Sequence, residues 1–235
     1  MPGPVALVGA GEFLPSMSLF DAELLASTGR ARPRVAILST ASFPDGEDVF
    51  QRWAALGVQH FEGLGAEVEP VMVRDRPSAD DAAAAQAIGE ADLIYLSDGK
   101  PGYLLTALQG SAVERSLVAA HDRGAVLAGC SAGAMGLAGY AFDFRMRLAP
   151  WPLRWRSGLG FAPGISVVPH YDAWPEPLSA MIALQAPRGC AVLGIDEETA
   201  VVGRDGSWQV HGRARVTVWR GRHRERFRVG EAFRI

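Results

Sequence analysis

The sequence predicts a single α/β domain in which a mostly parallel, doubly wound β-sheet is flanked by helices and followed by antiparallel strands. Short apolar runs alternate with longer segments of helical period, which is the pattern of this fold class. The runs are apolar on both faces, as expected for parallel strands that helices cover on both sides. Arginines alternate with apolar residues near the end of the chain, which is typical of half-exposed antiparallel strands.

Five apolar runs are the expected parallel strands, at residues 5–9, 34–40, 68–73, 91–97 and 124–129. Helical periodicity appears between them, at residues 45–64, 79–89, 103–108 and 112–123. This alternation of strand and helix predicts the doubly wound sheet.

The pattern changes after Gly139. Residues 140–158 mix aromatic residues, arginines and prolines, and we expect a long loop or a short hairpin there. Further strands follow in GISVVPHY, CAVLGIDEETAVVG, SWQVHGRARVTVWR and RFRVGEAFRI, and Asp205 with Gly206 forms a favoured hairpin turn. Because no linker or repeat divides the chain, we expect one domain over residues 1–235. Its core would span about 1–203, and a β extension would span about 204–235.

Composition and charge exclude several partners. A net charge of −3 gives no electrostatic reason to expect a nucleic acid or a membrane as the main partner. A basic patch is the alternative explanation of the arginines near the end of the chain. No apolar run approaches the ~20 residues that cross a bilayer, and the first residues resemble a strand rather than a signal peptide.

Cysteine and histidine usage indicates the compartment and the absence of a cofactor. Two cysteines, Cys130 and Cys190, do not make a disulfide framework, so we expect a cytoplasmic protein. The histidines and cysteines have no metal-ligand spacing, so we expect neither a metal nor another cofactor. Association into a homodimer is compatible with the sequence.

The stretch GAVLAGCSAGAMGLAG interrupts an apolar strand with a hydroxyl between glycines. Its centre, Gly129-Cys130-Ser131-Ala132-Gly133, has the G-x-S-x-G pattern of a nucleophile on a sharp strand-to-helix turn. Flanking glycines remove Cβ atoms that would clash in such a turn, and the helix N-terminus brings backbone N–H groups to the hydroxyl. The glycine frame centres on Ser131, which leaves Cys130 as a buried apolar residue. A glycine-rich turn with an incidental serine is the alternative.

A serine nucleophile needs a base and a group that orients the base. Among the five histidines, His170 alone ends an apolar strand, where ligand crevices form in parallel sheets. Asp172, Asp196 and Glu197 are the candidate orienting acids, and their spacing does not decide among them.

Several segments, in order, carry a resemblance to a known family. They are LVGAGEF, LIYLSDGKPGYLLTAL, GCSAGAM, VVPHYD and GIDEETAVV, and together they cover most of the chain up to about residue 203. The sequence resembles the dipeptidase E and cyanophycinase family of serine peptidases, which has a class I glutamine amidotransferase-like fold.

The resemblance implies a hydrolase that cleaves small peptides or isopeptides through an acyl-enzyme, without a cofactor. Ser131 would be the nucleophile and His170 the general base. Glu197 takes the acid role of the cyanophycinase-like members, and Asp172 is the second choice. The aspartate of the dipeptidase branch has no counterpart at a matching offset, since the loop offers only Asp143.

The resemblance also implies an oxyanion hole made by the backbone N–H groups of Gly99 and Ala132. The candidate substrate-binding residues are Glu12, Asp98, Lys100 and Arg154.

Two positions depart from the family pattern. Asp98 replaces the first of two paired glycines, and Lys100 stands where a small polar residue is common. A carboxylate beside an oxyanion hole is unfavourable unless it points away or pairs with Lys100.

The segment after His170 also lacks the arginine that holds the substrate carboxylate in aspartate-selective members. We therefore expect the loop 140–158 to set substrate preference. Its arginines are Arg145, Arg147, Arg154 and Arg156.

Two other functions are compatible with this fold. The departures at Asp98 and Lys100 favour a catalytically silent binding or regulatory protein. A glutamine amidotransferase is the weaker alternative, because its thiol nucleophile would have to occupy position 131, which is Ser131.

Overall fold

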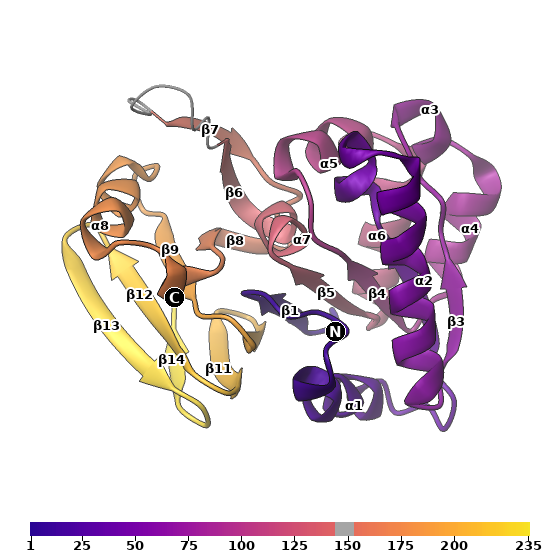
Figure 1. Ribbon diagram of the computed structural model, residues 1–235, viewed down its shortest axis with the longest axis horizontal. Helices are drawn as coiled ribbons and strands as arrows, with labels where there is room; N and C mark the ends of the chain where they lie inside the picture. The colour runs from indigo at the N-terminus through magenta and orange to yellow at the C-terminus, as the bar shows by residue number, and fades with distance from the viewer. Residues whose placement is uncertain (144–152) are drawn as a thin grey trace.

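The computed structural model describes residues 1–143 and 153–235, whose strands form two sheets (Figure 1). The first sheet has the order β14-β11-β10-β1-β5-β4-β2-β3. Its strands are β1 (Val5–Val8), β2 (Arg34–Leu38), β3 (Glu67–Pro70), β4 (Leu93–Leu96), β5 (Val126–Cys130), β10 (Thr199–Arg204), β11 (Ser207–Gly212) and β14 (Ala232–Arg234). The second has the order β13-β12-β9-β8-β6-β7. Its strands are β6 (Ala138–Asp143), β7 (Arg154–Ser157), β8 (Ala162–Val168), β9 (Ala191–Ile195), β12 (Arg215–Arg220) and β13 (His223–Arg228).

Strands form at all five predicted positions and are adjacent in the first sheet. β3 differs from the prediction of a buried strand over 68–73, because it covers Glu67–Pro70 and is largely exposed at the edge of the sheet. β1, β5, β4, β2 and β3 pair in parallel, and β10 adds to β1 in the antiparallel direction. Alternate residues of β1 enter different cores: Val5 and Leu7 lie in one apolar cluster, and Ala6 and Val8 lie in the other. The sheet is therefore covered on both faces, and the predicted α/β class is confirmed.

Helices from different parts of the chain cover the two faces. α1 (Ser18–Ser27) and α2 (Glu47–Gly63) contribute to the cluster that contains Val8. α4 (Ala82–Glu90), α5 (Pro101–Leu108) and α6 (Ala112–Arg123) contribute to the other cluster. The remaining helices are α3 (Arg76–Ala79), α7 (Ala132–Leu137), α8 (Glu176–Gln185) and the 3-10 turns Pro15–Met17, Thr40–Asp45 and Tyr171–Ala173. Apolar residues do not follow a single stripe on α1 or α8, and neither helix was predicted.

The later strands are divided between the two sheets. β11 and β14 extend the first sheet, and β12 and β13 extend the second, so residues 204–235 complete both sheets rather than form a layer of their own. Asp205 and Gly206 make the predicted hairpin turn, with φ angles of 52° and 77°. β6 and β7 pair antiparallel, with Tyr140–Asp143 opposite Arg154–Ser157, which agrees with the hairpin alternative for the described part of residues 140–158.

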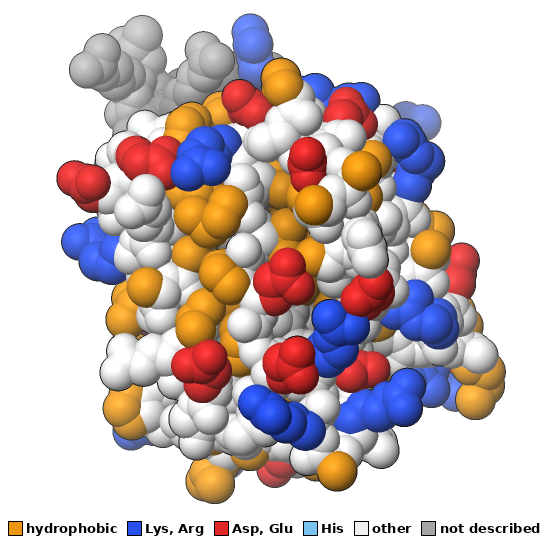
Figure 2. All heavy atoms as spheres, turned by 90° about the vertical axis from the view of Figure 1, so that its right-hand side faces the viewer, with side chains coloured by type: hydrophobic (Ala, Val, Ile, Leu, Met, Phe, Trp, Pro, Cys, Tyr) orange, Lys and Arg blue, Asp and Glu red, His pale blue; other side chains and the backbone are white. Residues whose placement is uncertain are grey.

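The charge on the surface and the length of the helices bear on the partners considered in the sequence analysis. On the side where α2, α4 and β3 lie, acidic and basic side chains are interspersed with apolar ones (Figure 2). In the described residues, every helix is too short or too polar to traverse a lipid bilayer.

Candidate active site

Ser131 lies at the sharp turn between β5 and α7. Its backbone has φ 48° and ψ −106°, outside the conformations that a non-glycine residue normally adopts. The amide of Ser131 donates to the carbonyl of Val8 on the neighbouring strand at 2.9 Å, which holds the turn against the sheet. The strand–turn–helix context expected for Ser131 is present.

The glycines on either side of Ser131 are required by close backbone contacts. A Cβ atom on Gly129 would lie 2.5 Å from the carbonyl carbon of Gly133, and one on Gly133 would lie 2.0 Å from the carbonyl oxygen of Leu96. The strand-to-helix turn at Ser131 therefore packs closely against β4, and larger residues at positions 129 and 133 would push these segments apart.

His170 connects Ser131 with an acid. The His170 Nε2 atom lies 3.2 Å from Ser131 Oγ, and its Nδ1 atom lies 3.0 Å from Glu197 Oε1. With the proton on Nδ1, the ring donates to Glu197 and can accept the proton of the Ser131 hydroxyl. His170 itself has a left-handed backbone, with φ 49° and ψ 40°, as the chain turns sharply after β8.

Among the three candidate acids, Glu197 alone contacts the histidine ring. Asp172 instead accepts a hydrogen bond from the backbone N–H of Glu197 at 2.9 Å. Asp196 is buried and forms an ion pair with Arg215 at 3.3 Å, and burial raises the pKa of its carboxyl group. The contact of Asp172 with the Glu197 amide and the ion pair of Asp196 with Arg215 therefore both help to fix the loop that carries Glu197.

The carboxylate of Asp98 occupies the expected oxyanion hole. Asp98 Oδ1 accepts hydrogen bonds from the backbone N–H groups of Gly99 at 2.6 Å and of Ala132 at 3.3 Å. The Lys100 ammonium pairs with Asp45 at 3.2 Å. Asp98 thus neither points away from the hole nor pairs with Lys100, the two arrangements that would have relieved the unfavourable charge.

The carboxyl group of Glu12 accepts hydrogen bonds from two residues beside the expected oxyanion hole. Its Oε1 atom accepts from the Asp98 backbone N–H at 2.9 Å, and its Oε2 atom accepts from the Cys130 thiol at 2.8 Å. Glu12 is only 7% exposed, and burial raises its pKa. Both oxygens of the Glu12 carboxyl group thus accept from protein donors, and the expectation that Glu12 binds substrate stays a prediction that these contacts do not support. Burial also raises the pKa of Cys130 well above its ordinary value, so this neighbour of Ser131 stays a thiol.

Residues 5–211 match the model of peptidase family S51. The chain belongs to this family. The uncharacterized peptidase YgaJ of Bacillus subtilis (strain 168) is 30% identical over 169 residues, which is 72% of this chain and 68% of that protein. Membership in S51, a family of serine-type peptidases, agrees with the predicted resemblance.

Solved structures agree with the S51 assignment. The crystal structure of a peptidase from an acI-B1 Actinobacterium superposes with a TM-score of 0.89 at 31% identity, covering 100% of this chain and 98% of that one. The structure of a peptidase E protein from Listeria monocytogenes EGD-e has a TM-score of 0.65 at 16% identity, covering 91% of this chain and 100% of that one. The second match shows the shared fold alone.

A pocket of about 600 Å³ opens beside the candidate oxyanion hole of this S51 chain. Aromatic and apolar side chains form much of its wall, together with Lys100, Asp143 and Arg156. Arg156 donates to the carbonyl of Gly102 at 2.8 Å and lies 3.6 Å from the Asp143 carboxylate. The lining residues are Gly99, Lys100, Pro101, Gly102, Tyr103, Thr106, Met135, Phe142, Asp143, Arg156, Pro169 and Trp174.

Arg154 is not part of this wall. It begins β7 and is exposed, whereas Arg156, two residues later, lines the pocket. The choice of Arg154 as a substrate-binding residue therefore stays a prediction that the lining of this pocket does not support. Arg145 and Arg147, which were also considered, lie outside the described residues.

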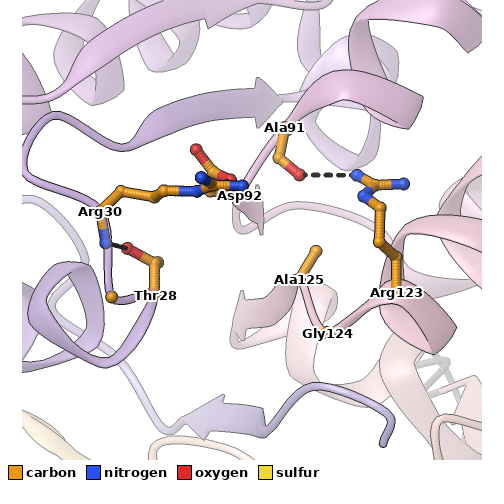
Figure 3. Close-up of a pocket in the computed structure, with 8 residues that line it drawn as sticks. Thr28, Arg30, Ala91, Asp92, Arg123, Gly124 and Ala125 are labelled. Carbon is orange, nitrogen blue, oxygen red and sulfur yellow. Dashed lines mark hydrogen bonds and ion pairs between the residues drawn. The ribbon is translucent and has the colours of Figure 1, made fainter.

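Another cavity, of about 300 Å³, lies near the start of β4 and β5, at the ends of these strands opposite Ser131 (Figure 3). Its arginines are already bound: Arg30 pairs with Asp92 at 3.3 Å, and Arg123 donates to the carbonyl of Ala91 at 3.2 Å. We therefore do not assign it a ligand. Within residues 1–143 and 153–235, no cluster of three or more His, Cys, Asp or Glu side chains could hold a metal ion.

Proposed function

We propose that this S51 chain is a peptidase in which Ser131, His170 and Glu197 form the catalytic triad. The observation that carries the proposal is the continuous pair of contacts from Ser131 Oγ to His170 Nε2 and from His170 Nδ1 to Glu197 Oε1. A nucleophile, a base and an orienting acid in this sequence of contacts can activate a hydroxyl group.

The reaction would run through an acyl-enzyme. Ser131 Oγ attacks the carbonyl carbon of the substrate while His170 Nε2 takes the hydroxyl proton, and Glu197 stabilises the resulting imidazolium. The carbonyl oxygen becomes an oxyanion, which the backbone N–H groups of Gly99 and Ala132 would bind. The carbon–nitrogen bond then breaks, and His170 protonates the leaving amine. A water molecule, activated by His170, hydrolyses the ester and restores Ser131.

The adjoining pocket supports small peptides or isopeptides as substrates. Phe142, Tyr103 and Trp174 offer apolar surface for a side chain of the substrate, and Arg156 offers a charge that Asp143 only partly neutralises. The position of Arg156 supports the expectation that residues 140–158, rather than the segment after His170, set the preference.

Hydrolysis of a panel of dipeptides and isopeptides tests the proposed function. The released amine would be measured for the wild type, Ser131→Ala and Asp92→Asn, a change far from Ser131. We expect turnover in the wild type and the Asp92 variant, and a loss of several powers of ten in Ser131→Ala. Hydrolysis that persists in Ser131→Ala would refute the assignment of the nucleophile.

A further inference from the structure

Both N–H groups that the proposed function assigns to the oxyanion are already engaged in the resting chain. The Gly99 and Ala132 amides converge on one atom, Asp98 Oδ1, at 2.6 and 3.3 Å. A carboxylate oxygen carries the same kind of negative charge as the oxyanion of a tetrahedral intermediate, and strong hydrogen bonds from N–H groups stabilise both. Asp98 is therefore an internal anion in the place where the reaction creates one.

The backbone that carries Asp98 is fixed, so only the side chain is free to leave. The Asp98 amide is held by buried Glu12 at 2.9 Å. Gly99 has φ 145°, and a Cβ atom there would lie 2.2 Å from the carbonyl group of Ala41. The amide of Lys100 donates to the Ala41 carbonyl at 2.7 Å, which ties the loop down on the other side. Rotation of the Asp98 side chain empties the hole without moving the Gly99 amide.

No cation in this loop holds the Asp98 carboxylate away from the hole. Lys100, the single lysine of the sequence, pairs with Asp45. The hydrogen bonds that Asp98 accepts come from the two amides of the hole, and nearby Glu12 adds a second carboxyl group. Asp98 is thus retained in the hole by the same donors that the oxyanion needs.

We propose that Asp98 gates the oxyanion hole, so that its carboxylate must leave the Gly99 and Ala132 amides before the tetrahedral intermediate forms. This inference rests on the proposed function. Two anions cannot share the same two donors, because each would lose hydrogen bonds and repel the other. The gate lowers the fraction of molecules that are competent to react. If the carboxylate occupies the hole for 90–99% of the time, the apparent reactivity of Ser131 falls by about 10- to 100-fold.

The rate of Ser131 phosphonylation by a fluorophosphonate probe tests the gate. In this step Ser131 Oγ forms a bond to phosphorus, the phosphorus–fluorine bond breaks, fluoride leaves, and His170 takes the hydroxyl proton. The phosphonyl oxygen needs the same hole as the oxyanion. We expect the second-order rate constant to rise at least about tenfold in Asp98→Ala. Asp98→Asn should rise less, because its neutral amide oxygen still fits the two donors.

Controls separate the gate from the proposed function. Asp92→Asn removes a carboxylate at the opposite end of β4 and should label at the wild-type rate, and thermal unfolding reports whether each variant is folded. Rates in Asp98→Ala and Asp98→Asn that equal or fall below the wild-type rate would overturn the gate while leaving Ser131 as nucleophile. Absence of Ser131-dependent labelling in every variant would overturn the proposed function, and the gate with it.

Discussion

The carboxylate of Glu197 and the ring of His170 meet at 3.0 Å, although they come from loops that follow different strands, β9 and β8. These strands pair in parallel, so the two loops emerge at the same edge of the second sheet. Asp172, two residues after His170, binds the Glu197 backbone instead of the ring. From these contacts we expect separate tasks for the two acids: Glu197 would orient the imidazole, and Asp172 would position Glu197.

The first prediction separates these tasks. Glu197→Gln should lower kcat by about 10³- to 10⁴-fold, because the imidazolium loses its stabilising charge and the ring its preferred tautomer. Asp172→Asn should lower kcat by about tenfold or less, because its amide oxygen can still accept from the Glu197 amide. Steady-state kinetics of both variants would measure the difference. A larger loss in Asp172→Asn than in Glu197→Gln would reverse the assignment.

The second prediction concerns Cys130. Cys130→Ala should keep kcat within about threefold of the wild type, because the thiol faces Glu12 and not the nucleophile's substrate side. Loss of the thiol hydrogen bond should lower the free energy of unfolding by about 1 kcal/mol. Kinetics and urea unfolding of the variant test both parts. An inactive but folded Cys130→Ala would show that the glycine frame was centred on the wrong residue.

The third prediction concerns buried Glu12. Burial raises its pKa above the ordinary value of 4.5, so the folded chain binds this proton more tightly than the unfolded chain does. Its contribution to stability is therefore fully present below pH 4.5 and is lost as the pH rises through the folded-state pKa.

Glu12→Gln should accordingly gain stability relative to the wild type as the pH rises above 4.5. Urea unfolding at several pH values between about 4 and 8 measures this difference. Titrating groups that do not interact with Glu12 cancel in the comparison. A difference between the two chains that does not change with pH would contradict the effect of burial on Glu12.

The fourth prediction concerns Gly133, in the strand-to-helix turn that carries Ser131. Gly133→Ala should destabilise the fold by more than about 2 kcal/mol, because the new Cβ would meet the backbone of Leu96. Gly63→Ala is the matched control: it lies in α2 with nothing within 4 Å of the added Cβ, and it should stabilise by about 0.5–1 kcal/mol. Unfolding midpoints of the two variants should shift in opposite directions.

The fifth prediction concerns substrate preference. Arg156→Ala should raise KM for substrates with an acidic side chain beside the scissile bond more than for apolar ones, because Arg156 is the arginine that lines the pocket among residues 1–143 and 153–235. The ratio of kcat/KM for acidic and apolar dipeptides measures this effect. Cleavage confined to aspartyl substrates that survives in Arg156→Ala would mean that another residue holds the acidic side chain.

The sequence indicates the parts of the fold that depend on local patterns. Apolar runs predict β1, β2, β4 and β5, and the glycine frame predicts the turn at Ser131. The run at 68–73 predicts β3 less well, because β3 covers the mostly exposed segment Glu67–Pro70. The turn at Asp205 and Gly206 is predictable because type I′ geometry requires positive φ angles that few residues tolerate.

The remaining features depend on contacts between distant segments. The choice of sheet for β11 and β12 is set by pairing with β10 and β9, which an alternating pattern does not encode. The Asp98 side chain enters the hole because the loop that carries it is held by Glu12, 86 residues earlier in the chain. Likewise, Glu197 rather than Asp172 meets the His170 ring because the loop after β9 brings the Glu197 side chain to the ring, while Asp172 accepts from the Glu197 amide.

Identification of the labelled residue tests the central claim most directly. The chain would be treated with a fluorophosphonate to completion, digested, and analysed by mass spectrometry to locate the adduct. We expect one adduct per chain, on Ser131, and none in Ser131→Ala or His170→Ala, because the hydroxyl group reacts only when the ring can take its proton. An adduct on a different residue, or labelling of Ser131 that does not depend on His170, would contradict the account.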